Sequence, residues 1–252
     1  GKEHIYDTLF NQMGVARCNT LSELCETLKL FHKFRALKGD KIAFMGPSGG
    51  DMAMIGDMSA KLSINYSPIP KDIVKKLKKI NHKGVIVSNP FDLQTYNWND
   101  PISIKKTFDL MFKANFDLIG LMLDFPNMND CDIDEWEAIV DEYILSAKQK
   151  KKRAAIIASL PETLPKHIRD KCLKSGIVAN TFHINIVPAF QIVDYSHASP
   201  CPDSESFPIV FWVCFLGRTY GTFPVRIKIV PCILYEQVIF LHEPLSIFAP
   251  SQ

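Results

Sequence analysis

The chain lacks the cysteine spacing of a disulfide framework, a zinc site or a redox motif. Its seven cysteines are odd in number and scattered, and no C-x-x-C pair occurs among them. Net charge is also nearly absent, because 29 Lys and Arg residues against 27 Asp and Glu residues leave only +2. We therefore expect no nucleic-acid partner. A reduced intracellular compartment is expected, either the cytoplasm or an organellar matrix.

No apolar run of the sequence is suited to span a membrane. Residues 207–216 are too few, and residues 227–241 are interrupted by Lys228, Pro231 and Glu236. The first residues are polar and charged, without the apolar stretch of a secretory signal. The chain does not begin with Met, which predicts a fragment or a processed protein. We expect no membrane partner.

Apolar strand-like runs instead alternate with amphipathic helical segments from Lys41 to about Ala179. The expected strands cover residues 42–45, 85–90, 118–124, 154–160 and 177–179, and the expected helices cover 52–58, 71–80, 104–115, 132–149 and 164–174. This alternation predicts an α/β fold with a doubly wound parallel sheet and right-handed crossovers. A short helical lead, residues 2–13 and 20–34, precedes the sheet, with a capping box at Thr20 and Glu23.

A glycine-rich turn, Gly46-Pro-Ser-Gly-Gly, joins the first expected strand to its helix. Such a turn directs free backbone N–H groups at the positive end of a helix dipole, so Gly46, Ser48, Gly49 and Gly50 are candidate anion-binding residues. The spacing matches neither G-x-G-x-x-G nor the P-loop, and a tight strand-to-helix connection is the alternative. Asp51, which follows directly, argues against a free anion and is a candidate helix cap.

A second candidate loop, residues 89–98, follows the second expected strand. Asn89 and Asp92 either orient the glycine turn or a partner loop, or serve as an ordinary strand exit and a turn cap. Tyr96 and Trp98 either line an acyl pocket or an interface, or pack against the end of the sheet. The residues alone leave both pairs of alternatives open.

The remaining polar residues do not form a recognisable catalytic or metal site. The spacing of Asp124, Asp130, Asp132 and Asp134 lacks the Gly and terminal Glu of a calcium loop, so charge at a helix start is the better interpretation. No histidine has a ligand partner at a known spacing. Ser48 has no triad partner, which argues against a serine hydrolase. We assign no catalytic residue and no metal ligand.

Three post-strand segments in this order resemble the NDP-forming acyl-CoA synthetases, relatives of succinyl-CoA synthetase and of ADP-forming acetate–CoA ligase. The segments are Gly-Pro-Ser-Gly-Gly at 46–50, Ser-Asn-Pro-Phe-Asp-Leu at 88–93 and Leu-Asp-Phe-Pro at 123–126. Residues 6–15 are similar to the family stretch just after its phosphohistidine loop. The resemblance covers roughly residues 1–179 and implies a flavodoxin-like domain of the succinyl-CoA synthetase type.

The resemblance implies an activity that couples an acid, CoA and a nucleoside triphosphate to form an acyl-CoA, a nucleoside diphosphate and phosphate. A phosphohistidine carries the phosphoryl group between two remote sites, and helix N-termini hold it. The glycine turn 46–50 matches one of these termini, which favours the anion-site interpretation. ATP or ADP, CoA and Mg are implied for the full enzyme, and none is assigned to this chain.

The chain also departs from the family pattern. The family histidine would lie just before Gly1, so His4 is not assigned a catalytic role, and neither a CoA-binding domain nor an ATP-grasp region is visible. Both are expected as partner domains or subunits, and the chain alone is expected to be inactive. The expected divisions are 1–37, the end of a preceding ligase domain with a linker helix; 38–180, the flavodoxin-like domain; and 181–252, an atypical tail.

The tail is rich in proline and aromatic residues and poor in charge. It is either a divergent β appendage or sequence not selected to fold with this domain, and we favour the second, expecting low order beyond about residue 182. Two other functions remain as alternatives to the ligase fragment. One is a non-catalytic interaction module, and the other is a nucleotide or flavin binder that uses the same sheet crevice.

Overall fold

The computed structural model describes residues 4–6, 8, 18, 20–34, 39, 41–61, 66–127, 131–181, 213–214 and 226–227. For residues 59–61, 213–214 and 226–227 only the backbone is described.

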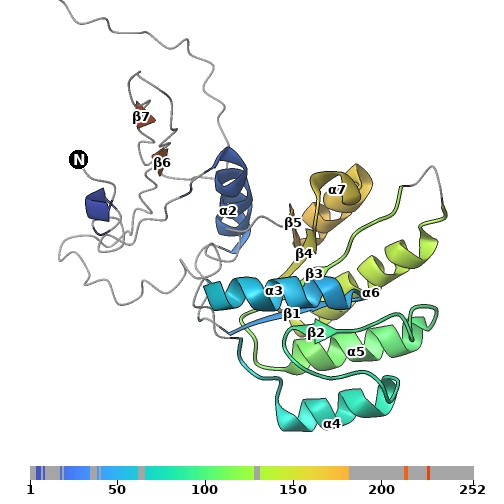
Figure 1. Cartoon of the computed structure of the whole chain (residues 1–252). Helices are drawn as coiled ribbons and strands as arrows, with labels where there is room; N and C mark the ends of the chain where they lie inside the picture. Colours follow the sequence, from blue (N-terminus) through green and yellow to red (C-terminus); the bar gives the residue numbers. More distant parts are fainter. Residues whose placement is uncertain are drawn as a thin grey trace, which may run out of the picture.

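Five parallel strands form one sheet in the order β2-β1-β3-β4-β5 (Figure 1). The strands are β1 (Ile42–Gly46), β2 (Phe91–Asp92), β3 (Leu118–Met122), β4 (Ala154–Ala158) and β5 (Val178–Thr181). The central strands β1, β3 and β4 are buried along their whole length. This is the pattern of parallel strands covered on both faces, and the strand order is that of flavodoxin-like folds. The predicted doubly wound α/β fold is confirmed.

Alternate residues along the strands contact different helices. Ile42 and Phe44 of β1 pack with α2 (Leu21–Phe34) and α3 (Gly49–Lys61) on one face. The residues between and after them, Ala43 and Met45, pack on the other face with the remaining helices. These helices are α4 (Lys71–Ile80), α5 (Pro101–Lys113), α6 (Asp134–Lys150) and α7 (Lys166–Ser175). The sheet is therefore the middle of three layers.

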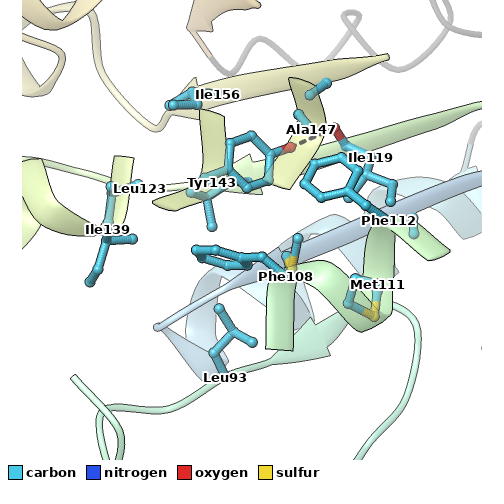
Figure 2. Packing of buried hydrophobic residues seen from close by; sticks show 14 of the residues in the cluster. Leu93, Phe108, Met111, Phe112, Ile119, Leu123, Ile139, Tyr143, Ala147 and Ile156 are labelled. Atoms are coloured by element: carbon cyan, nitrogen blue, oxygen red, sulfur yellow. Dashed lines mark hydrogen bonds between the residues drawn. The ribbon is translucent and has the colours of Figure 1, made fainter. Parts of the chain in front are cut away.

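The larger core cluster is centred on Tyr143 of α6 (Figure 2). Its ring contacts Phe108 and Phe112 of α5, with ring centroids 5.3 and 5.1 Å away. Its hydroxyl lies 2.8 Å from the carbonyl oxygen of Ile119 in β3 and 3.1 Å from that of Ala155 in β4. Burial raises the pKa of Tyr143 well above its usual value, so the hydroxyl remains a donor at any working pH.

The helix α2 closes the free edge of β5. Glu26, although buried, has partners, because its carboxylate accepts from the Thr181 N–H (3.1 Å) and pairs with Lys29 (2.7 Å). Lys29 also donates to the carbonyl oxygen of Ala179 (3.3 Å). The predicted cap of α2 is present, since the Glu23 N–H donates to the Thr20 hydroxyl (3.1 Å). The lead helix is thus attached to the sheet through polar groups.

Most predicted elements are present with shifted ends. The helices predicted at 104–115, 132–149 and 164–174 correspond to α5, α6 and α7, while α4 has the predicted bounds. The last helix, α7, ends at Gly176, which takes the left-handed conformation with φ 81°.

The prediction of the second strand at 85–90 is wrong, because the strand β2 begins only at Phe91. The cause is the side chain of Asn89, whose amide takes the place of a strand backbone beside β1. Its Oδ1 accepts from the Phe44 N–H (3.1 Å), and its Nδ2 donates to the Ile42 carbonyl (2.9 Å). Backbone pairing then starts with Met45 opposite Phe91.

Several predictions fall outside the described residues. The helix predicted at 2–13 is helical at residues 4–6 and 8, and the rest of it is not described. In the predicted tail, 181–252, the structure describes Thr181 at the end of β5 and an antiparallel pair of short strands, β6 (Val213–Cys214) and β7 (Arg226–Ile227). The predicted low order of the tail is therefore untested.

Candidate functional site

The glycine turn lies at the point where the connections of the sheet diverge. From β1 the chain crosses to β2, at one edge of the sheet, whereas from β3 it continues to β4 on the other side. Ligands of open α/β sheets bind in the crevice outside the carboxyl ends of the strands at such a point. The glycine turn 46–50 and the segment 123–127 after β3 flank this crevice.

Two glycines of the turn are required by close neighbours. A Cβ atom at Gly46 would lie 2.7 Å from the carbonyl oxygen of Met122, and one at Gly49 would lie 2.8 Å from Oδ2 of Asp92. Real Cβ atoms do not approach other atoms so closely. The turn is therefore packed directly against the last residues of β3 and β2.

Ser48 caps α3 and engages two amides of its first turn, those of Asp51 and Met52. Its hydroxyl accepts from the Asp51 N–H (3.3 Å), and its carbonyl accepts from the Met52 N–H (3.1 Å). The amides of Gly49 and Gly50 have no hydrogen-bond partner among the described residues, and both glycines are exposed. Two free amides thus remain at the positive end of the α3 dipole.

Three carboxylates surround this helix terminus. Asp92 approaches Gly49 from the second loop, Asp51 lies in the first turn of α3, and Asp124 follows β3. Burial raises the pKa of Asp51, and the negative charge of Asp124 raises it further, while a hydrogen bond with Ser48 partly offsets both effects. The site therefore combines two N–H donors with a negative field, which weakens the binding of a free anion.

Asp124 connects the segment after β3 to the loop after β4 and to α6. Its Oδ1 accepts from the Ser159 N–H (2.8 Å) and from the Thr163 hydroxyl. Its backbone carbonyl accepts from the indole N–H of Trp136 in α6 (3.0 Å). The sequence placed Asp124 in the post-strand segment 123–126 and considered it as a cation ligand or as charge at a helix start, but no local pattern indicated these contacts.

The second loop is held mainly by structural contacts. Besides β1, Asn89 Nδ2 donates to the carbonyl of Ser67 (2.8 Å). Asp92 Oδ1 accepts from the Gln94 N–H (2.8 Å), an Asx turn that fits the left-handed φ of 51° at Gln94. Both side chains therefore stabilise backbone, and Asp92 also lies against the glycine turn.

The two aromatic residues of the second loop have different surroundings. Trp98 is partly buried and packs edge-on against Trp136, with ring centroids 5.3 Å apart. Tyr96 is 60% exposed and stacks on His82, with ring centroids 4.1 Å apart. The structure therefore does not bring them together into one pocket with the glycine turn, and Tyr96 is the one available to a partner.

Within the described ranges, no group of three or more His, Cys, Asp or Glu side chains is arranged to hold a metal ion. None of the helices in the described part of the chain is both long and apolar enough to cross a bilayer.

Comparison with known proteins gives one curated relative. The chain is 27% identical over 93 residues to the acetate–CoA ligase (ADP-forming) of Methanocaldococcus jannaschii, a match that covers 37% of this chain and 13% of the relative. No protein-family model matches the chain. The match supports the resemblance stated from the three post-strand segments.

Solved structures share the fold. PH0766 from Pyrococcus horikoshii OT3 has a TM-score of 0.64 at 19% identity, covering 79% of this chain and 45% of that one. The dinucleotide-forming acetyl-coenzyme A synthetase 1 of Candidatus Korarchaeum cryptofilum has a TM-score of 0.63 at 16% identity, and this chain covers 42% of it. That protein was also solved in complex with phosphate and ADP. The chain thus resembles a part of the NDP-forming acyl-CoA synthetases and spans less than half of each relative.

Proposed function

We propose that this chain is one part of an NDP-forming acid–CoA ligase, which makes an acyl-CoA from a carboxylic acid, CoA and ATP. Residues 38–180 supply the flavodoxin-like domain, residues 1–37 the end of a preceding ligase domain, and 181–252 an atypical tail. The partners are the CoA-binding and ATP-grasp domains or subunits. The similarity to the acetate–CoA ligase and to two larger solved proteins supports this proposal.

Within this ligase, the glycine turn receives the phosphoryl group carried by a phosphohistidine of another part. The observation that carries this role is the pair of exposed Gly49 and Gly50 amides at the N-terminus of α3 and at the switch point of the sheet. Both amides donate to phosphoryl oxygens, and Ser48 keeps the terminus in shape through its two capping bonds.

The surrounding carboxylates fit a tethered phosphoryl group better than free phosphate. The negative charges of Asp51, Asp92 and Asp124 repel a phosphate anion, so free phosphate binds weakly. A phosphohistidine arrives on a covalent tether, which raises its effective concentration to the millimolar range, so a weak site suffices. Weak binding also lets the group leave for its second site.

The other groups that the full enzyme needs are nucleotide, CoA and Mg. We assign them to the partner domains, because the resemblance implies them for the full enzyme and for no residue of this chain.

The role of the turn is tested by inorganic phosphate binding, followed by ³¹P NMR line broadening. By Coulomb's law, one unit charge about 6 Å from another at an effective dielectric near 60 contributes about 1 kcal/mol, or about fivefold in affinity. Asp51→Asn should therefore bind phosphate about fivefold more tightly than the unmodified chain. Asp57→Asn is the matched control, because Asp57 is exposed on the same helix two turns further on. Equal affinities for the two variants would refute the assignment.

A second candidate is a non-catalytic interaction module of the same fold. The acidic surroundings of the turn and the exposed Tyr96 favour it. It predicts no phosphate binding by the chain at any accessible concentration, with or without Asp51.

A further inference from the structure

Asp124 follows β3 at the carboxyl edge of the sheet, the edge at which the glycine turn also lies. That strand is the neighbour of β1 in the sheet, and the chain at Met122 is in close contact with Gly46. The Asp124 side chain does not point into solvent as an ordinary strand exit does. Instead, Oδ1 accepts from the Ser159 N–H at 2.8 Å and from the Thr163 hydroxyl.

The two donors belong to one loop, residues 159–163, which follows β4. The loop contains the short 3-10 helix Pro161–Thr163, and the Thr163 N–H donates to the Leu160 carbonyl at 3.2 Å. The Thr163 hydroxyl has a single proton, which the Asp124 carboxylate and the Leu160 carbonyl (2.9 Å) share. The loop is joined to the segment after β3 by Asp124 and by the bond from the Phe125 N–H to the Thr163 carbonyl (2.8 Å). Arg169 of α7 holds it from the other side, through a bond to the Pro161 carbonyl (3.5 Å).

The Trp136 indole fixes Asp124 from the other side, through its bond to the Asp124 carbonyl (3.0 Å). With both its carbonyl and its Oδ1 engaged, the carboxylate has a defined place. Its negative charge also acts on Asp51, whose pKa is raised first by burial and then by Asp124.

We propose that Asp124 is a positioning residue of the phosphate site: it holds loop 159–163 as the second wall of the crevice and sets a fixed negative charge opposite the N-terminus of α3. This inference rests on the proposed function of the turn. The fixed charge keeps the phosphoryl group loosely bound, and the loop limits the access of water. The groups that act on the Asp51 carboxyl are the Ser48 hydroxyl and the charge of Asp124, and Asp92 of β2 lies against Gly49 in the turn.

Two substitutions separate the charge from the positioning. Asp124→Asn keeps an oxygen that accepts from Ser159 and Thr163 but removes the charge. Asp124→Ala removes both. In the unmodified chain and in Asp124→Asn, the Ser159 amide should exchange slowly with deuterium. In Asp124→Ala it should exchange at least about tenfold faster, which corresponds to a loss of about 1.4 kcal/mol in the free energy of local opening.

Titration of the Asp51 carboxyl measures the effect of the Asp124 charge on its pKa, and it needs no ligand. In both variants the Asp51 carboxyl, followed by ¹³C NMR, should titrate at lower pH than in the unmodified chain, because a neighbouring negative charge is gone. The Asp57 carboxyl on the same helix is the internal control and should not shift. An unchanged Asp51 midpoint in both variants, or unchanged Ser159 exchange in Asp124→Ala, would overturn the inference.

Phosphate affinity then connects the two results to function. Asp124→Asn should bind inorganic phosphate several-fold more tightly than the unmodified chain, and Asp124→Ala should lose most of this gain. If no variant binds phosphate while Ser159 exchange and the Asp51 titration change as expected, the proposed function fails and the positioning of loop 159–163 stands. If Asp124→Ala binds phosphate as tightly as Asp124→Asn, the loop is not a wall of the site.

Discussion

Asn89 should contribute strongly to stability, because its side-chain amide bonds two backbone groups of β1 that a neighbouring strand would otherwise use. It makes three hydrogen bonds to backbone groups: 3.1 Å from the Phe44 N–H, 2.9 Å to the Ile42 carbonyl and 2.8 Å to the Ser67 carbonyl. At about 1 kcal/mol net for each bond, Asn89→Ala should lower the free energy of unfolding by about 3 kcal/mol.

Asn89→Asp sharpens this prediction. A carboxylate keeps the acceptor for the Phe44 N–H but loses the two donors and faces two carbonyl oxygens, so it should destabilise the protein at least as much as alanine does. Urea unfolding followed by the fluorescence of Trp98 and Trp136 measures both variants. Asn115→Ala is the control, because Asn115 is exposed and has no side-chain hydrogen bond in the part of the chain that is described. A loss below about 1 kcal/mol for Asn89→Ala would refute the view that its amide substitutes for strand pairing.

Two further predictions concern the helices. Tyr143→Phe should lower the free energy of unfolding by about 1–2 kcal/mol, since it removes the hydroxyl that donates to the Ile119 and Ala155 carbonyls. Tyr96→Phe, at an exposed site, should lower it by less than about 0.5 kcal/mol in the same urea assay. Glu137 pairs α6 with α7; burial acts to raise its pKa, but hydrogen bonds from His167 and Lys171 outweigh this and lower it. The Glu137 carboxylate therefore stabilises the protein fully at pH values above its pKa in the unfolded chain. This stabilisation is lost as the pH falls through its lower pKa in the folded protein. Glu137→Gln should lower the melting temperature at neutral pH and have no effect at strongly acidic pH, and Glu162→Gln should have no effect at either; a pH-independent loss for Glu137→Gln would contradict this reasoning.

The elements that could be predicted from sequence are those whose signals are local. Residues 118–122 and 154–158 are continuously apolar and form the buried strands β3 and β4. The amphipathic period of 71–80 predicts α4 with its observed bounds. Gly176 ends α7 because glycine readily takes the left-handed conformation that follows a helix. In each case the local pattern and the tertiary environment favour the same conformation.

The second strand was predicted at the wrong residues because, at that point, the partner of β1 is the side chain of Asn89 and not a strand backbone. Propensity favoured strand at 85–90, but the Asn89 amide occupies the β1 groups that a backbone would use, and no local pattern reports that.

The candidate site was incomplete for the same reason. The glycine turn was evident from spacing, whereas the convergence of Asp51, Asp92 and Asp124 on it depends on which strands are neighbours. Sequence also placed Tyr96 and Trp98 together, although one stacks on His82 and the other packs against Trp136. Residues near in sequence but divided by a turn need not share a site.

The phosphate-binding role of the turn is tested most directly by the amide resonances of the chain itself. Titration with inorganic phosphate, followed by ¹⁵N-resolved NMR, should shift the Gly49 and Gly50 amides progressively and more than any other described amide. The Asp51 and Met52 amides, already bonded to Ser48, should shift less. If the largest shifts instead fall on the lysines of α4, or if Gly49 and Gly50 stay unchanged at saturating phosphate, the turn does not bind the phosphoryl group.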